Sequence, residues 1–265
     1  MHDKKKTEIT VGFASHFPSS AERALKHMED ADVILVEMPA KTIKDLAKGA
    51  PLYSLTEGTI NTEYEEAFLS GLKQKIEEGK TVRGYESVYD PGRWTKDEFR
   101  ELMESKRNAD ISLVRGDIAS FAENLAKFNK MREAKTVEWI KRNMSMFRGK
   151  RVYIEAGASH TGLYHMLKKD LGPKGISVKS DFIEKSNFGR GMLDKFAPSD
   201  QMIRMIRFGT PSSKNPAALA RLAEEDRGFR EIESRLKEEY RMKGLSRERA
   251  SEMAHFGALR RFRRR

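Results

Sequence analysis

The stretch from Arg151 to Leu171 constrains the fold of this chain more than any other. A short run of β-branched and aromatic residues, Val152 to Ile154, is typical of a buried strand. It leads through Gly157 to His160, and the apolar residues that follow recur at helical spacing until Gly172-Pro173 ends the pattern. We therefore expect His160 in a turn between a strand and a helix, which is where open parallel sheets bind ligands.

The beginning of the chain repeats this arrangement. The run Ile9 to Val11 predicts a strand, and His16 follows it shortly before another helical pattern. The apolar run Asp32 to Glu37 predicts the next strand, so that strand, helix and strand form a βαβ unit with a parallel pair. Two further strands are expected at Thr81–Glu86 and at Ile176–Val178.

The remaining segments have mainly helical patterns. Asp110 to Phe147 is mostly helical, and two more helices are expected at Ala217–Arg241 and Leu245–Ala258. The sequence thus predicts an α/β fold: a mostly parallel sheet with helices on both faces, a long helical insertion before the fourth strand, and a helical C-terminal extension. We expect an α/β domain over residues 1–213 and a basic extension over residues 214–265.

Composition excludes several classes of protein. The chain has no cysteine, which rules out disulfides, zinc–thiolate sites and cysteine nucleophiles. We find no apolar run near the roughly 18 residues that a membrane span needs, and the polar start Met1 to Lys6 does not resemble a signal peptide. A cytoplasmic protein without a membrane span is the expectation.

The positive charge is concentrated near the C-terminus. The net charge is +11, and Lys214 to Arg265 contains 15 basic and 9 acidic residues, about half of the excess. The helix Ala217–Arg241 is expected to pack on the body of the protein or on a second copy, as in a homodimer. The run Arg260 to Arg265, with Phe256 and Phe262, is a candidate contact for RNA, phosphate or an acidic protein.

Four polar residues follow four of the expected strands: His16, Glu37, Glu86 and His160. Since the carboxyl ends of parallel strands meet at one edge of a sheet, these side chains are expected to converge. Two imidazoles and two carboxylates suit a divalent cation such as Zn, Mn, Fe or Co, which would activate a bound water. Without a metal, the same residues can act as general base, general acid and histidine orienters.

A single member of this set would carry little weight. A glutamate after a strand is often solvated or caps a helix, and a lone histidine in a turn often only forms a hydrogen bond. The prediction therefore depends on the repeated position. Arg132, inside the long helical segment, is expected either to clamp a substrate carboxylate or phosphate or to hold Glu37 or Glu86 in place.

These motifs resemble the TraB/PrgY–GumN–TIKI family, which belongs to a wider superfamily with erythromycin esterase and the ChaN-like haem-binding proteins. The similarity covers roughly residues 8 to 180. It rests on Gly-Phe-Ala-Ser-His16, on Val-Ile-Leu-Val-Glu37, on Arg132-Glu133-Ala134-Lys135-Thr136, and on Gly157-Ala158-Ser159-His160-Thr161-Gly162. Glu133 stands where the family usually has Asp or Asn, and Thr136 where it usually has Met.

The resemblance implies a mixed α/β fold with a site at the edge of the sheet. It further implies metal-dependent peptide hydrolysis in the TIKI branch and ester hydrolysis in other branches. Our leading prediction is a metal-dependent hydrolase of a peptide, ester or phosphoester bond, with His16, His160, Glu37, Glu86 and Arg132 as site residues.

Two other functions are kept open. One is a non-catalytic binding or regulatory protein of the same fold, whose basic tail contacts RNA or an acidic partner. The other is a haem or small-ligand binder that uses His16 or His160 as an axial ligand.

Overall fold

The computed structural model describes residues 6–56, 62–88, 90–157, 160–183, 198–208 and 215–262. The chain divides into two compact units. The first comprises Met1–Thr95 and Arg132–Lys185, and the second comprises Lys96–Met131 and Ser186–Arg265. These limits differ from the expected boundary between residues 213 and 214, because the segment from residue 96 to 131 groups with the C-terminal helices.

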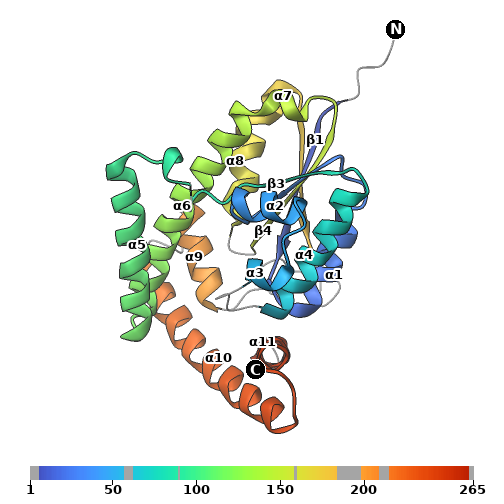
Figure 1. The fold of residues 1–265 in the computed structure, drawn as a ribbon. Helices are drawn as coiled ribbons and strands as arrows, with labels where there is room; N and C mark the ends of the chain where they lie inside the picture. The colour runs from blue at the N-terminus through green and yellow to red at the C-terminus, as the bar shows by residue number, and fades with distance from the viewer. Residues whose placement is uncertain are drawn as a thin grey trace. The chain divides into compact units, whose positions relative to one another are not determined.

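The first unit is built around a five-stranded sheet (Figure 1). Its strands are β1 (Glu8–Ala14), β2 (Val33–Val36), β3 (Thr81–Gly84), β4 (Arg151–Gly157) and β5 (Ser177–Phe182). They lie in the order β3-β2-β4-β1-β5, and all four strand pairs are parallel. The predicted α/β fold with a parallel sheet is therefore confirmed.

The expected pairing of the first two strands is wrong. β1 and β2 run parallel, but β4 lies between them and pairs with both, with Gly12 opposite Glu155 and Leu35 opposite Ile154. The reason is that β4 is buried along all of its length after Arg151, so the centre of the sheet accommodates it. The βαβ pattern predicts that β1 and β2 run in the same direction. Whether they lie next to each other depends on β4, which comes much later in the chain.

Helices cover both faces of this sheet. They are α1 (Pro18–His27), α2 (Ala40–Ala47), α3 (Leu52–Thr56), α4 (Thr62–Glu77), α7 (Met144–Phe147) and α8 (Thr161–Leu171), with short 3-10 turns at η1 (Pro91–Arg93) and η2 (Gly172–Lys174). Figure 1 shows α1 and α4 on one side of the strands and α8 on the other. The two faces thus bury two separate apolar cores.

Each core combines alternate residues of the strands with one set of helices, as expected of side chains that alternate between faces. On the face of α1 and α4 the core includes Ile34, Val36, Val82, Ala24, Met28, Phe68 and Leu72. On the opposite face it includes Val11, Val33, Leu35, Ile154, Val137, Ile140, Leu163 and Leu167. Burial of this apolar surface is the main stabilising contribution to the sheet.

The second unit consists of helices. It contains α5 (Lys96–Val114), the first part of α6 (Ile118–Arg142), α9 (Pro198–Phe208), α10 (Pro216–Met242) and α11 (Arg247–Phe262). From Arg132 onward, α6 belongs to the first unit. The helical segment before β4 and the helical C-terminal extension are both confirmed.

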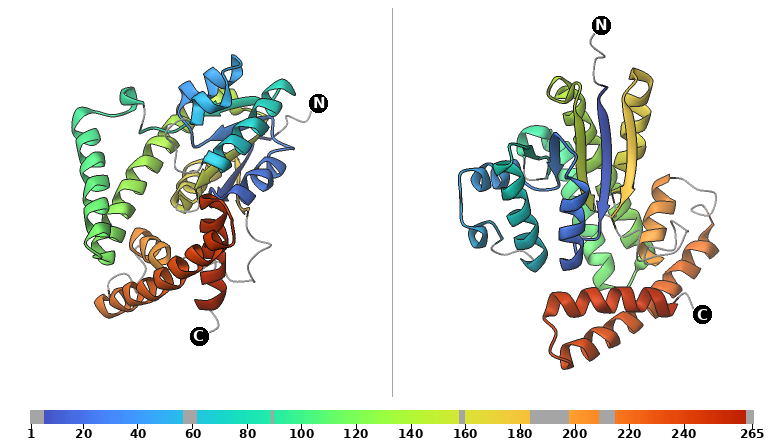
Figure 2. Two further views of the ribbon diagram at one scale, coloured as in Figure 1. Left: turned by 60° about the horizontal axis from the view of Figure 1, so that its bottom comes forward. Right: turned by 90° about the vertical axis from the view of Figure 1, so that its right-hand side faces the viewer.

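α10 and α11 pack against each other, as both views of Figure 2 show. Phe229, Ile232 and Leu236 of α10 are buried against Ala254 and Ala258 of α11. The apolar face of the expected Ala217–Arg241 helix is thus covered in part by the next helix of the same chain. Of the basic run at the end of the chain, Arg263 to Arg265 lie outside the described residues. Within the described part of the chain, none of the helices is long and apolar enough to cross a bilayer.

Candidate functional site

The five residues predicted from the sequence come together in the first unit. His16 follows β1, Glu37 follows β2, Glu86 follows β3 and His160 follows β4, all at the carboxyl edge of the sheet. Arg132 reaches this edge from α6, where it ion-pairs with Glu37 and Glu86. Convergence at the strand ends is what the parallel topology requires.

Arg132 lies between two carboxylates. Its Nη2 donates to Glu37 Oε1 at 2.6 Å and also to Glu86 Oε2. All three side chains are mostly buried, at 15%, 11% and 8% exposure. Burial alone would lower the pKa of the Arg132 guanidinium, but the two carboxylates raise it. Of the two roles expected for Arg132, the structure therefore favours the one in which it holds the glutamates in place.

His160 lies between two carboxylate oxygen atoms, one of which is the Glu37 oxygen that Arg132 also contacts. Its Nε2 is 3.0 Å from Glu37 Oε1, and its Nδ1 is 3.3 Å from Glu133 Oε1. Burial alone would lower the pKa of His160, but the charge of Glu37 and the hydrogen bonds to Glu133 and Glu37 raise it to about 9. At neutral pH the ring is therefore an imidazolium, and Nε2 donates to Glu37.

Protonation of His160 also shows how the contact between Arg132 and His160 should be interpreted. Arg132 Nη1 lies 3.2 Å from His160 Nε2, and the nitrogen could accept from it only as a neutral imidazole. Because both cations share the carboxylate of Glu37, that group compensates their repulsion. Burial would raise the pKa of Glu37, but His160 and Arg132 hold it well below its ordinary value. We call Arg132, His160, Glu37 and Glu86 the charged cluster.

His16 forms a second, separate pair. Its Nε2 donates to Glu155 Oε1 at 2.8 Å, and Glu155 is only 2% exposed whereas His16 is 32% exposed. The ring stacks on Tyr64, with 5.0 Å between ring centroids. His16 also has a φ of 53°, the only positive φ of a non-glycine residue in the described ranges. A left-handed backbone of this kind is uncommon and often occurs at functional positions.

Glu155 connects the His16 pair to the charged cluster. Its Oε2 accepts a hydrogen bond from the backbone N–H of Glu37 at 3.2 Å, and its Oε1 accepts one from the Tyr64 hydroxyl at 3.5 Å. The Tyr85 hydroxyl donates to the Glu155 carbonyl at 2.8 Å. The first two donors hold the Glu155 carboxylate in position, and Tyr85 holds its backbone.

Gly157 separates the two histidines. A Cβ at this position would lie 3.5 Å from His16 Cε1, 3.5 Å from His160 Cδ2 and 3.2 Å from Glu37 Oε2. The Gly157 N–H also donates to Glu37 Oε2 at 2.7 Å. Both rings would thus lie at ordinary contact distance from a Cβ, whereas the Glu37 carboxylate would be too close to it.

Gly157→Ala is expected to lower the free energy of unfolding by about 1–3 kcal/mol, because the new methyl group lies 3.2 Å from the Glu37 carboxylate, which has to shift. Urea denaturation measures the change. The matched control is Gly228→Ala in α10, where an added Cβ meets nothing within 4 Å and should leave stability unchanged or slightly raised. Equal effects of the two substitutions would contradict the crowding.

The four residues expected to bind a metal do not form a preformed metal centre in the described structure. Glu37, Glu86 and His160 are engaged with Arg132 or with one another, and His16 is engaged with Glu155. Within the described ranges, no group of three or more histidine, aspartate or glutamate side chains is arranged to hold an ion. Binding of Zn, Mn, Fe or Co therefore stays a prediction, which metal analysis of the purified protein tests.

A cavity of about 360 Å³ opens beside His16. Its walls combine four carboxylates with apolar and aromatic side chains, and no lysine or arginine of the described residues lines it. The acidic members are Glu37, Glu65, Glu86 and Glu155, and the apolar members are Met38, Pro39, Leu55, Tyr64, Phe68 and Leu69. We call this space the His16 cavity.

The sequence-based prediction missed Glu155, Glu133 and Tyr64. Glu155 had a detectable signal, because it is a carboxylate within the otherwise apolar strand Val-Tyr-Ile-Glu-Ala-Gly. Glu133 was noted only as a departure from a family pattern. Tyr64 lies in α4 among apolar residues such as Phe68 and Leu72, and nothing in the sequence distinguishes a tyrosine that packs there from one that faces a site.

Comparisons with known proteins assign no family. No protein-family model matches the chain, and no curated protein and no solved structure matches it. The resemblance to the TraB/PrgY–GumN–TIKI family therefore stays a prediction, and the chemistry of the site has to be argued from the residues of this chain.

Proposed function

We propose that this protein is a hydrolase in which His16 acts as general base. The observation that carries the proposal is the hydrogen bond from His16 Nε2 to the buried carboxylate of Glu155, on the wall of a cavity. An imidazole oriented by a carboxylate and accessible from a cavity is the arrangement that general-base chemistry needs.

The hydrogen bond defines the tautomer of His16. When Nε2 carries the proton that Glu155 accepts, the lone pair lies on Nδ1, which is then the basic atom. Nδ1 takes a proton from a water molecule as that water attacks the substrate carbonyl, and the imidazolium returns this proton to the leaving alcohol or amine when the tetrahedral intermediate collapses. Glu155 then stabilises the imidazolium that forms, and this role requires a carboxylate that stays ionised and in position.

The charged cluster supports this pair. The backbone N–H of Glu37 donates to Glu155, so the position of Glu37 affects the orientation of His16. Arg132 and His160 hold Glu37 from the other side. In this proposal Arg132 and His160 are positioning residues, and they act on catalysis through Glu37 and Glu155.

The charged residues that line the His16 cavity favour some of the expected substrates over others. Its lining has four carboxylates, and the described residues contribute no basic side chain other than His16. A phosphoester carries negative charge, and these walls offer it no lysine or arginine among the described residues. An ester or a peptide bond in a neutral or cationic substrate is therefore favoured over the phosphoester that we also considered.

The test is a hydrolysis panel with the full chain. It contains p-nitrophenyl esters with neutral and cationic acyl groups, aminoacyl p-nitroanilides, and bis(p-nitrophenyl) phosphate. His16→Gln is expected to lower kcat/KM for the best ester or anilide by about 10²–10⁴-fold, the usual contribution of a general base. The matched control is His255→Gln, which removes another histidine–glutamate pair, with Glu233 at 2.8 Å.

The same panel is repeated under two further conditions, without metal and with added metal. The same assays with EDTA, and with added Zn²⁺ or Mn²⁺, separate a metal-assisted reaction from one that uses His16 alone. Hydrolysis that is equal in wild type and His16→Gln would refute the role of His16. Absence of turnover on the whole panel, with and without metal, would refute the hydrolase and favour the binding or regulatory function.

A further inference from the structure

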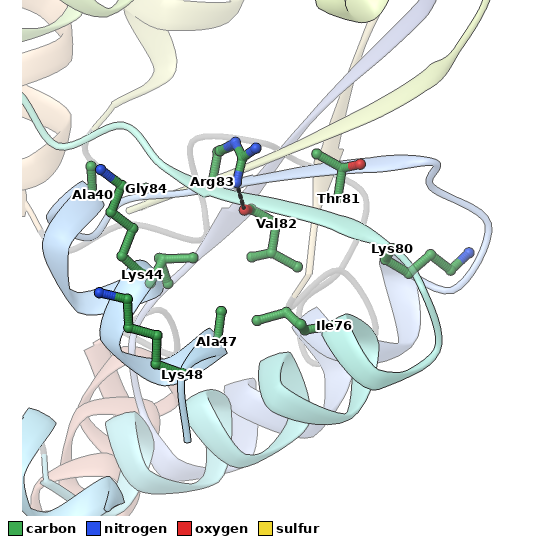
Figure 3. Close-up of a pocket in the computed structure, with 11 residues that line it drawn as sticks. Ala40, Lys44, Ala47, Lys48, Ile76, Lys80, Thr81, Val82, Arg83 and Gly84 are labelled. Carbon is green, nitrogen blue, oxygen red and sulfur yellow. Dashed lines mark hydrogen bonds between the residues drawn. The ribbon is translucent and has the colours of Figure 1, made fainter. Parts of the chain in front are cut away.

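A second cavity lies beside β3 in the first unit. It measures about 530 Å³ and has none of the lining residues of the His16 cavity. Its eleven lining residues come from α2, from β3, and from the end of α4 with the turn that follows (Figure 3). We call it the β3 groove. The inference drawn from it does not depend on the proposed hydrolase activity.

The groove runs along the outer edge of the sheet. Among the described strands, β3 pairs only with β2 and is therefore an edge strand. The lining includes every residue from Lys80 to Gly84. Because successive side chains alternate between the two faces of a strand, a cavity that touches all of them must follow the strand edge.

The backbone of β3 presents hydrogen-bonding groups to this edge. The N–H of Thr81 donates to Asp32 O at 3.3 Å, and that of Tyr85 donates to Val36 O at 3.0 Å, so these residues face β2. Since the direction alternates along a strand, the N–H and C=O groups of Val82 and Gly84 point away from β2. An edge of this kind is a template for another strand.

The side chains around the groove add an apolar floor and a basic rim. Figure 3 shows Val82, Ala47 and Ile76 directed into the space between β3, α2 and α4. Lys44 and Lys48 extend along one side of it, and both are exposed. Among the described residues neither lysine forms an ion pair, and the lining contains no acidic side chain.

Lys80 and Arg83 also line the groove, and they differ in whether their charged groups can contact a ligand. Lys80 is engaged elsewhere, because its Nζ donates to the carbonyls of Glu29 and Ala31 at 2.9 and 2.8 Å. Arg83 Nη1 lies 3.5 Å from the Val82 carbonyl, at the outer limit of a hydrogen bond. An incoming N–H can take over that carbonyl and leave the Arg83 guanidinium for a carboxylate.

We propose that the β3 groove binds an extended acidic segment of a partner protein as an added strand. The main chain of the segment would pair with Val82 and Gly84, which gives affinity without dependence on sequence. An apolar side chain of the segment would fill the floor, and flanking carboxylates would pair with Lys44, Lys48 and Arg83. The charge of the rim selects an acidic segment over a basic one.

Fluorescence anisotropy with the full chain tests this proposal. The probe is a fluorescein-labelled peptide in which Glu alternates with Val, and the comparison peptide has Lys in place of Glu. The double variant Lys44→Glu/Lys48→Glu is expected to bind the acidic peptide at least about tenfold more weakly than wild type. The control is Lys73→Glu, an exposed lysine of α4 outside the groove, which should bind as wild type does.

The acidic peptide with alternate backbone nitrogens methylated separates strand addition from attraction by charge alone. It should bind at least about tenfold more weakly, because it cannot form the strand hydrogen bonds. Binding that is unaffected by methylation or by the lysine reversals would overturn the proposal. So would absence of peptide binding to wild type together with binding of decanoate, which would assign the groove to a small amphipathic anion. Circular dichroism confirms that each variant is folded.

Discussion

Arg132→Met is expected to lower the free energy of unfolding by about 3–5 kcal/mol, the usual cost of removing one partner from a buried ion pair. The substitution leaves Glu37 and Glu86 without the guanidinium that both of them contact. Methionine fills a similar volume, so the loss reports charge and hydrogen bonding more than a cavity. Urea denaturation at pH 7 measures it.

The same substitution on the same helix provides the control. Arg142→Met removes an ion pair with Glu138 in which the arginine is 73% exposed, and it should cost less than about 1 kcal/mol. Adding Glu37→Gln and Glu86→Gln to Arg132→Met should recover part of the stability, because the uncompensated charges are then gone. Similar costs for the two arginines, or no recovery in the triple variant, would contradict the charged cluster.

His160 is expected to make the stability of the protein depend on pH in the alkaline range. Its pKa is raised to about 9 in the folded protein, against an ordinary value of 6.5. The protonated ring therefore stabilises the folded state fully below pH 6.5, and this contribution is lost as the pH rises toward 9. A difference of this size corresponds to about 3 kcal/mol.

Comparison with His160→Asn isolates this contribution. The variant should be less stable than wild type at pH 6, and the difference between the two proteins should shrink as the pH approaches 9. Urea denaturation at several pH values gives the two curves, and the NMR titration of the His160 ring gives its midpoint directly. Parallel curves for the two proteins, or a midpoint near 6.5, would show that Glu37 does not hold the proton on His160.

Much of this architecture can be predicted from the sequence because its signals are local. The apolar runs at Ile9–Val11, Asp32–Glu37 and Val152–Ile154 each correspond to a strand. Since parallel strands end at one edge, the residues that follow them were expected to converge, and His16, Glu37, Glu86 and His160 do lie at that edge.

The features of the fold and the site that the sequence does not predict depend on contacts between distant parts of the chain. No local pattern indicates that β4 separates β1 from β2. Glu155 becomes a partner of His16 only through a hydrogen bond that spans 139 residues. The sequence also left two roles for Arg132, and the choice between them depends on where α6 directs its side chain.

The central position of β4 has a consequence for how the chain folds during synthesis. β1 and β2 leave the ribosome long before residues 151 to 157, yet each needs β4 to complete its pairing. Until that strand is made, two apolar strand edges lack their native neighbour, and such edges are prone to wrong associations. Glu155 is part of this same strand, so the strand that joins β1 to β2 also brings the carboxylate that pairs with His16.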